Sequence, residues 1–190
     1  MTIPFAARFP VLFHVTDRAA LPGIARHGLL SAERLCAWLG ADGDLGANRL
    51  AWRSLETPLG RAALRRQGMP DAALRSRLDP AIDVAEWRRF INAHAFLCVR
   101  RTDAQHLMRA ELGRDQAVIA FPTAALIAAG CAPRFCAFNN GHIDRSAPDR
   151  RRLRSFGDYR PIAAWVPGTP IREISIHGGI PPSIAFGPAS

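Results

Sequence analysis

The chain contains no lysine, and all 25 of its basic residues are arginine. A lysine-free composition points to a GC-rich genome, so the choice of arginine by itself carries little functional information. The net charge carries more, because 25 basic residues against 16 acidic residues give +9 at neutral pH. A charge of this size favours approach to polyanions, so DNA or RNA is weighed as a partner against a generic basic surface.

Membrane and export signals are missing as well. No apolar run approaches the roughly 18 residues that a transmembrane helix needs. Residues 1–13 lack the basic segment and long apolar core of a signal peptide. The four cysteines are irregularly spaced, which favours small buried thiols over disulfides or metal ligands. We therefore expect a cytoplasmic protein without a membrane partner.

The familiar catalytic motifs are also absent. The chain has no Walker loop, no Gly-x-Gly-x-x-Gly after a strand, no His-Glu-x-x-His and no Gly-x-Ser-x-Gly. Its six histidines are dispersed without metal-ligand spacing, which argues against a zinc enzyme, and we expect no metal site.

The composition and the order of the expected elements suit one domain of the α+β class over residues 1–190. A 48% hydrophobic content with 22% charged residues is ordinary for a globular protein. Short strands alternate with helices of irregular length, which fits a mixed sheet better than a regular doubly wound one. Strands are expected at 11–16, 94–99, 117–121, 134–138, 162–166 and 171–176.

Helices are expected where capping residues precede apolar periodicity. Thr16 or Asp17 would cap a helix that ends at Gly28, Ser31 a second helix and Asp83 a third. Further helices are expected from residue 102 to Gly113 and over 123–129. The inward side chains would be Leu21, Ile24 and Ala25 in the first helix, Leu35, Trp38 and Leu39 in the second, and Trp87, Phe90 and Ile91 in the third.

The remaining stretches are expected to be irregular. Residues 40–49 form a loop, and the arginine-rich residues 50–78 alternate loop and short helix. Asn139-Asn140-Gly141 is a turn signal, because Asn and Gly tolerate positive φ. Residues 144–160 form a polar, arginine-rich loop that would either hold a phosphate backbone or lie on the surface. Tyr159 and Trp165 would stack a base or lie in the core.

Two strand faces carry polar side chains, one near each end of the chain. Alternation puts His14 and Thr16 on one face of the first strand, together with Leu12. A core histidine paired with a backbone group is the alternative for His14. In the last strand, alternation puts Glu173 and Ser175 opposite the isoleucines. A solvated carboxylate on an edge strand is the alternative for Glu173.

These residues belong to a pattern similar to that of a known family. Three N-terminal segments resemble the opening of the DarT-type DNA ADP-ribosyltransferases: Phe13-His14-Val15-Thr16, Leu21-Pro22-Gly23-Ile24 and His27-Gly28-Leu29-Leu30-Ser31. RNA 2′-phosphotransferases open in a similar way. Residues 172–176 and 180–184 resemble the DarT segment that carries the catalytic glutamate.

The middle of the chain is similar to an uncharacterised bacterial domain family with the same N-terminal signature. The similar segments are residues 64–67, 87–92, 94–96, 138–141 and 155–159, so the resemblance spans nearly the whole chain. The chain departs from that family at Arg66, where an acidic residue is usual, and at Asn140, where serine is usual.

The resemblance implies an ADP-ribosyltransferase-like split sheet with a cleft for NAD as substrate. In such a site Glu173 would stabilise the positive charge that forms on the ribose as nicotinamide leaves, or orient a ribose hydroxyl. His14 and Thr16 would bind the ribose or the nicotinamide amide. Arg53 and Arg65 are candidates for the pyrophosphate. Arg53 is placed ahead, as a catalytic residue, because its order along the chain is similar to that of the DarT arginine. Gln67, Asn92 and Asn139 would position the cofactor.

Several functions stay open at this point. Transfer of ADP-ribose to an acceptor, such as a nucleic-acid base, is the leading hypothesis, in a toxin or defence context that could include an antitoxin partner. NAD hydrolysis keeps the same cleft with water as the acceptor. A non-catalytic module would bind a nucleotide or nucleic acid through the basic face. A solvated position on such a basic face is also the alternative for each arginine. RNA 2′-phosphotransfer is disfavoured, because that family's full set of paired histidines and arginines is missing.

Overall fold

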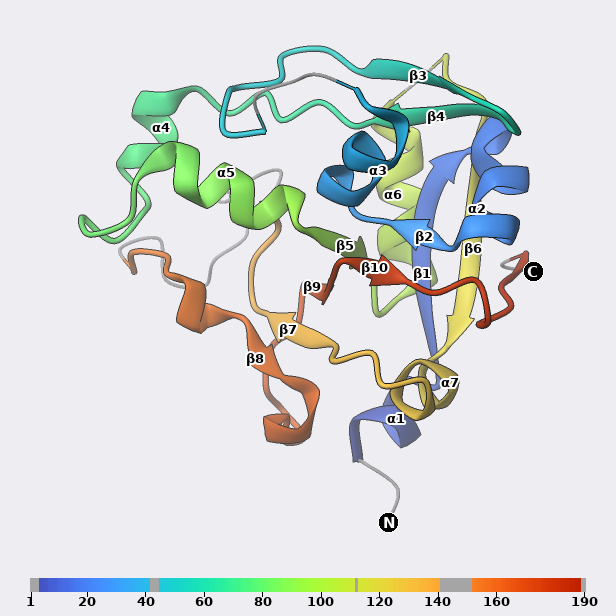
Figure 1. Cartoon of the computed structure of the whole chain (residues 1–190). Coiled ribbons are helices and arrows are strands. Elements are labelled where there is room, and N and C mark those ends of the chain that lie inside the picture. The colour runs from blue at the N-terminus through green and yellow to red at the C-terminus, as the bar shows by residue number, and fades with distance from the viewer. Residues whose placement is uncertain (1–3, 42–44, 112, 141–151, 189–190) are drawn as a thin grey trace.

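The computed structural model describes residues 4–41, 45–111, 113–140 and 152–188, and it confirms the expected α+β class (Figure 1). The helices are α1 (Pro4–Arg8), α2 (Leu21–His27), α3 (Ala32–Leu39), α4 (Asp71–Arg75), α5 (Val84–Asn92), α6 (Arg101–Arg109) and α7 (Thr123–Ala128). Short 3-10 helices are η1 (Arg18–Ala20), η3 (Phe156–Asp158) and η4 (Ile162–Ala164). Gly141 of the expected turn and residues 144–151 of the expected polar loop lie outside the described residues.

The strands form small antiparallel sheets. They are β1 (Val11–Asp17), β2 (Leu29–Leu30), β3 (Arg53–Thr57), β4 (Gly60–Leu64), β5 (His94–Leu97), β6 (Gln116–Pro122), β7 (Arg134–Cys136), β8 (Arg160–Pro161), β9 (Glu173–His177), β10 (Gly179–Ile180) and β11 (Gly187–Pro188). One sheet has the order β1-β6-β11 and another β5-β9-β7-β8, while β2 pairs with β10 and β3 with β4. Each of these pairings is antiparallel, so the mixed sheet expected from the sequence is wrong for the strands described here.

The two larger sheets meet at an isolated bridge between Phe13 of β1 and Cys98, just after β5. The N–H of Phe13 donates to the Cys98 carbonyl at 2.9 Å, and the N–H of Cys98 donates to the Phe13 carbonyl at 2.7 Å. One residue further along β1, the His14 side chain rather than the backbone contacts the Phe96 carbonyl. β1 and β5 therefore belong to two separate sheets that touch at this bridge, next to His14.

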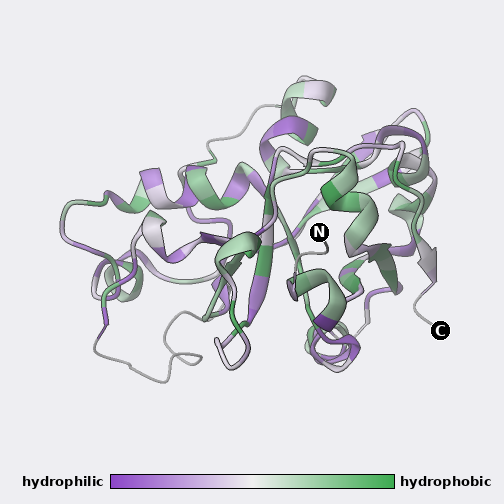
Figure 2. Ribbon diagram, turned by 90° about the horizontal axis from the view of Figure 1, so that it is seen from below, coloured by the Kyte–Doolittle hydropathy of each residue, from purple (hydrophilic) through white to green (hydrophobic). Residues whose placement is uncertain are grey.

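Two expected helix starts are confirmed. The Ser31 hydroxyl accepts a hydrogen bond from the N–H of Arg34 at 3.3 Å and begins α3. The Asp83 carboxylate accepts from the N–H groups of Ala85 and Glu86 and begins α5. Such caps supply partners that the first turn of a helix otherwise lacks. In Figure 2, α5 alternates between hydrophobic and hydrophilic residues along its length, as expected for a helix with one buried face.

The arginine-rich region contains a β-hairpin that the sequence analysis missed. β3 and β4 pair from Arg53 opposite Leu64 to Thr57 opposite Gly60. Leu55 and Leu64 are its buried side chains and pack with Cys36 of α3. The expected alternation of loop and short helix over residues 50–78 is thus correct only for α4 and the irregular residues around the hairpin.

Residues 162–166 do not form the expected strand. They begin with η4, in which the N–H of Trp165 bonds to the Ile162 carbonyl at 3.1 Å. Ile162 and Trp165 are both buried, and this spacing of three residues matches a 3-10 turn rather than a strand. Prolines at 161 and 167 flank the segment, and proline cannot donate to a strand ladder.

Other local expectations around α2 and α3 are also wrong. Neither Thr16 nor Asp17 caps α2, because η1 intervenes and the Asp17 carboxylate pairs with Arg114 instead. Ala25 is exposed, since the helix turns its Ile24 face inward. Trp38 is 41% exposed and packs against the His27 ring at a tilt rather than entering the core.

The main hydrophobic core joins β1, β5, β6 and β9, and a second core lies under α5. Tyr159 is 1% exposed within the second core, and Trp165 is 7% exposed within the first. The core alternative is therefore confirmed for both aromatic residues. Among the described residues, no helix has both the length and the apolar character needed to cross a membrane.

The N-terminal and C-terminal parts of the chain come together where β2 pairs with β10, and we call this close approach the crossing. Gly28, at the end of α2, has φ 84°, and a Cβ there would lie 2.1 Å from the Ile180 carbonyl oxygen. Gly179 has φ 108°, and its Cβ would lie 2.0 Å from the Leu29 carbonyl oxygen. Both positions thus require glycine for the backbones to approach, and this crossing fixes β9 relative to α2.

Candidate functional site

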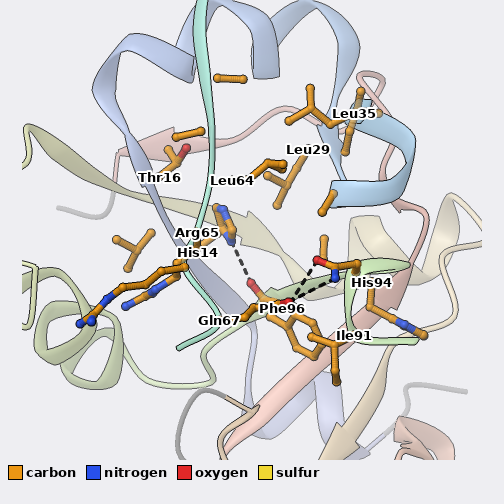
Figure 3. A pocket seen from close by; sticks show the side chains of 18 of the residues that line it. His14, Thr16, Leu29, Leu35, Leu64, Arg65, Gln67, Ile91, His94 and Phe96 are labelled. Carbon is orange, nitrogen blue, oxygen red and sulfur yellow. Dashed lines mark hydrogen bonds between the residues drawn. The ribbon is translucent and has the colours of Figure 1, made fainter. Parts of the chain in front are cut away.

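A pocket of about 570 Å³ is lined by residues of both β1 and β5 (Figure 3). Its walls come from β1, α2, α3, β4, the end of α5, β5 and the segment before residue 141. A volume of this size is within the range of small-molecule sites. The lining is largely apolar, with polar side chains gathered at β1, after β4 and at Glu173.

Most of the residues predicted from the sequence share this pocket. Its lining includes His14, Thr16, Arg65, Gln67, Asn92, Asn139 and Glu173. Arg53 is not brought to it. Arg53 is exposed at the start of β3, whereas Arg65 follows the end of β4, the paired strand that borders the pocket.

Glu173 is the buried acid of the pocket. It begins β9, which lies between β5 and β7, and it retains 9% of its surface. The solvated edge-strand alternative for this carboxylate is therefore wrong. Its Oε2 accepts a hydrogen bond from the N–H of Asn140 at 3.0 Å. Burial raises the pKa of the Glu173 carboxyl to about 7, although this hydrogen bond and the positive charge of Arg65 oppose the rise.

His14 supplies a neutral imidazole. Its Nδ1 lies 2.8 Å from the Phe96 carbonyl oxygen. Because a carbonyl can only accept, Nδ1 carries the proton and Nε2 is left as an acceptor. Burial lowers the pKa of His14; the hydrogen bond to Phe96 opposes the change and the charge of Arg65 adds to it. His14 thus has the backbone partner expected of a core histidine and also lines the pocket.

Arg65 lies in a charged rim around Trp52. Its guanidinium carbon is 5.6 Å from the centre of the indole, and that of Arg114 is 4.1 Å away. The Trp52 N–H donates to Glu111 at 3.2 Å, and Glu111 also pairs with Arg66 at 3.0 Å. The Arg65 side chain is 39% exposed and lies 3.7 Å from Glu111, so it keeps solvent-facing capacity to bind an anion.

Gln67 and Asn92 form a brace in the pocket wall. Their side-chain amides bond to each other reciprocally, at 3.1 Å and 3.2 Å. Asn92 also accepts from Arg49 at 3.2 Å and donates to the Leu45 carbonyl at 2.8 Å. These bonds link α5 to the segments before β3 and after β4. The arrangement gives both amides a role in holding the wall.

The local sequence pattern does not reveal the part played by Asn140 and Tyr159. The sequence predicts a turn residue at Asn140, but its backbone holds Glu173 and its side chain accepts a hydrogen bond from the buried Tyr159 hydroxyl. The turn signal was local and could not reveal a partner 33 residues away. Cys98 also lines the pocket, and burial raises the pKa of its thiol to about 12, so the thiol stays protonated at neutral pH.

No group of three or more His, Cys, Asp or Glu side chains that could hold a metal occurs in the part of the chain that the structure describes. The polar groups that remain are an acid, a neutral imidazole and a guanidinium. This set can bind a phosphate and hydroxyl-bearing ligand and can stabilise developing positive charge.

Fold and site together define a small α+β protein with the buried acid Glu173 in a largely apolar pocket. The model of a family of unknown function, DUF7002, matches residues 10–185, and the chain belongs to that family. No curated protein and no solved structure matches the chain.

Proposed function

We propose that this protein is an ADP-ribosyltransferase that uses NAD as its substrate and carries an ADP-ribosyltransferase-like split sheet. The observation that carries the proposal is the meeting of Glu173, His14 and Arg65 in one pocket, from strands and turns far apart in the sequence. The three groups match the chemistry of NAD: a ribose that becomes cationic, hydroxyl and amide groups, and a pyrophosphate.

Glu173 has the central role in this reaction. The bond between C1′ of the ribose and the nicotinamide nitrogen breaks, and its electron pair leaves with nicotinamide. The ionised Glu173 carboxylate stabilises the positive charge on the ribose. A nucleophile on the acceptor then bonds to C1′ and loses its proton. Because the carboxyl has a pKa of about 7, it can also take up that proton near neutral pH.

The other two groups, Arg65 and His14, bind different parts of NAD. Arg65 offers a guanidinium to the pyrophosphate, and its charge is only partly matched by Glu111 at 3.7 Å. The Nε2 acceptor of His14 suits a ribose hydroxyl or the amide N–H of nicotinamide, with Thr16 beside it on the same strand face. Arg65 therefore replaces Arg53 as our preferred arginine, because Arg65 lines the pocket.

The proposed acceptor is a nucleic-acid base. The chain carries a net charge of +9, and exposed Arg61 and Arg66 lie at the pocket. Phosphate contacts from such residues would supply affinity without reading a base sequence.

The test follows nicotinamide and label together. Purified protein is incubated with adenine-labelled NAD alone, with single-stranded DNA and with total RNA. Nicotinamide release with label on a polymer supports the transferase. Release without polymer label favours an NAD glycohydrolase, and neither product argues against both enzymes. Glu173→Gln is the matched control, since the amide keeps an oxygen for the Asn140 N–H but has no negative charge. We expect turnover to fall at least about 100-fold while NAD affinity stays within about tenfold.

A further inference from the structure

Asn140 closes the Glu173 end of the pocket with both its backbone and its side chain. The backbone N–H donates to Glu173 Oε2 at 3.0 Å, and Oδ1 of the side chain accepts from the hydroxyl of Tyr159. Asn140 therefore stands between a 1%-exposed tyrosine in the core under α5 and the buried acid of the pocket.

The hydrogen bond from Tyr159 fixes which way the Asn140 amide points. With Oδ1 held by the hydroxyl, the amide presents Nδ2 away from Tyr159. Nδ2 is buried, and it has no hydrogen-bond partner among the described residues. A buried donor without a partner is costly, and such groups usually have a ligand or water to bind. Asn140 and Glu173 both line the pocket, so this buried donor lies in the pocket wall at the Glu173 end.

We propose that Asn140 is a specificity-determining residue whose Nδ2 donates to the ligand group that Glu173 contacts, with Tyr159 as its positioning residue. Glu173 accepts hydrogen bonds and Asn140 donates them, so the pair selects a group that can do both. Hydroxyls and carboxamides have this property, while a phosphate oxygen beside Glu173 would meet like charge.

This inference rests on the proposed use of NAD and adds an orientation to it. In NAD, a carboxamide and a hydroxyl-bearing ribose lie together in the nicotinamide riboside half. That half therefore binds at the Glu173–Asn140 end of the pocket.

Two ligands separate this role from a general effect on the pocket. Carba-NAD, in which a methylene replaces the ribose ring oxygen, keeps the whole nicotinamide half but cannot be turned over. ADP keeps the adenosine and the diphosphate and lacks the nicotinamide half. Binding of both is measured by calorimetry to the wild type, Asn140→Ala, Tyr159→Phe and the double variant.

We expect Asn140→Ala to weaken carba-NAD about tenfold and to leave ADP affinity unchanged. Tyr159→Phe should weaken carba-NAD less, by about threefold, because the amide loses its fixed orientation but keeps its donor. It should add nothing in the Asn140→Ala background, as expected for two residues that act through one contact.

Equal weakening of both ligands would mean that Asn140 only supports the pocket wall, and no weakening would mean that Nδ2 has no ligand contact; either result overturns the inference. If the wild type binds ADP but not carba-NAD, the proposed function itself fails and this inference fails with it. The inference can therefore fail separately from the proposed function only if the wild type binds carba-NAD.

Discussion

At the scale of single residues, the role proposed for Glu173 predicts that activity depends on its protonation. Its pKa of about 7 reflects burial in the pocket wall, and the proposed reaction needs the ionised form. We expect kcat/KM for NAD to rise with pH through about 7 and to level off above it, because this parameter reports the ionisation of the free enzyme. Burial lowers the pKa of His14 below its usual value, so its titration lies on the acid side of this rise. A profile that is flat from pH 6 to 8 would contradict the assignment of Glu173.

The same burial makes Glu173 unfavourable for stability above neutral pH. The rise in pKa from 4.5 to about 7 means that the folded state holds a proton that the unfolded state releases. The free energy of unfolding therefore falls as pH rises from about 4.5 to 7, by about 3 kcal/mol in total, and the penalty remains above pH 7. We expect Glu173→Gln to be more stable than the wild type at pH 8 by up to this amount and similar to it at pH 4.5. Urea denaturation at both pH values measures the difference. A glutamine variant that is equally destabilised at both pH values would show that shape, and not charge, dominates at this position.

The sequence predicts site residues that follow from a local pattern, and it does not predict those that depend on contacts between distant parts of the chain. Strand alternation and resemblance were enough to select His14 and Glu173. They could not separate Arg65 from Arg53, because the choice depends on the hairpin register that puts Arg65 after the pocket-bordering strand. The bond between Tyr159 and Asn140 joins two segments through the core, and no local pattern announces it.

At the scale of elements, the starts of α3 and α5 were predictable because their capping signals are local, whereas the start of α2 was not. Ser31 and Asp83 cap the helices that immediately follow them. The β3–β4 hairpin has weaker local signals, since only Leu55 and Leu64 are buried along its two strands. Pro58 and Gly60 in its turn are the available clue, as Gly60 has φ 116°. Packing of the two leucines on α3 decides the structure of this segment, and that packing lies outside any local window.

The close pairing of β2 with β10 leads to a prediction about stability. Gly179→Ala should lower the free energy of unfolding by more than about 2 kcal/mol, because alanine is strained at φ 108° and its Cβ would meet the Leu29 carbonyl oxygen at 2.0 Å. Gly130 is the matched control: its φ is 75°, but its Cβ would meet nothing within 4 Å. Gly130→Ala should cost only about 1 kcal/mol. Equal costs in chemical denaturation would show that the backbone contact at the crossing does not limit stability.

At the scale of the whole molecule, a net charge of +9 predicts salt-sensitive binding to nucleic acid, but charge alone does not say where the strand lies. If a nucleic-acid base is the acceptor, the strand must lie close to the pocket. Arg61 and Arg66 line the pocket, with side chains 57% and 51% exposed. Arg75 has similar exposure, 49%, and is also paired with a carboxylate, but it is not among the residues that line this pocket.

These arginines therefore form a matched comparison. Binding of a fluorescent single-stranded oligonucleotide is measured by anisotropy over a series of salt concentrations. Arg61→Gln and Arg66→Gln should each weaken binding and reduce the slope of log affinity against log salt by about 0.7, the contribution of one phosphate contact on a single strand. Arg75→Gln should leave the slope unchanged, because the Arg75 side chain does not line the pocket and instead bonds to the Ile82 carbonyl and the Asp83 carboxylate, and exposed ion pairs contribute little by themselves. If all three substitutions reduce the slope equally, the strand follows the overall charge and not the pocket. The nucleic acid would then be a non-specific partner, and the acceptor of ADP-ribose would have to be sought among other molecules.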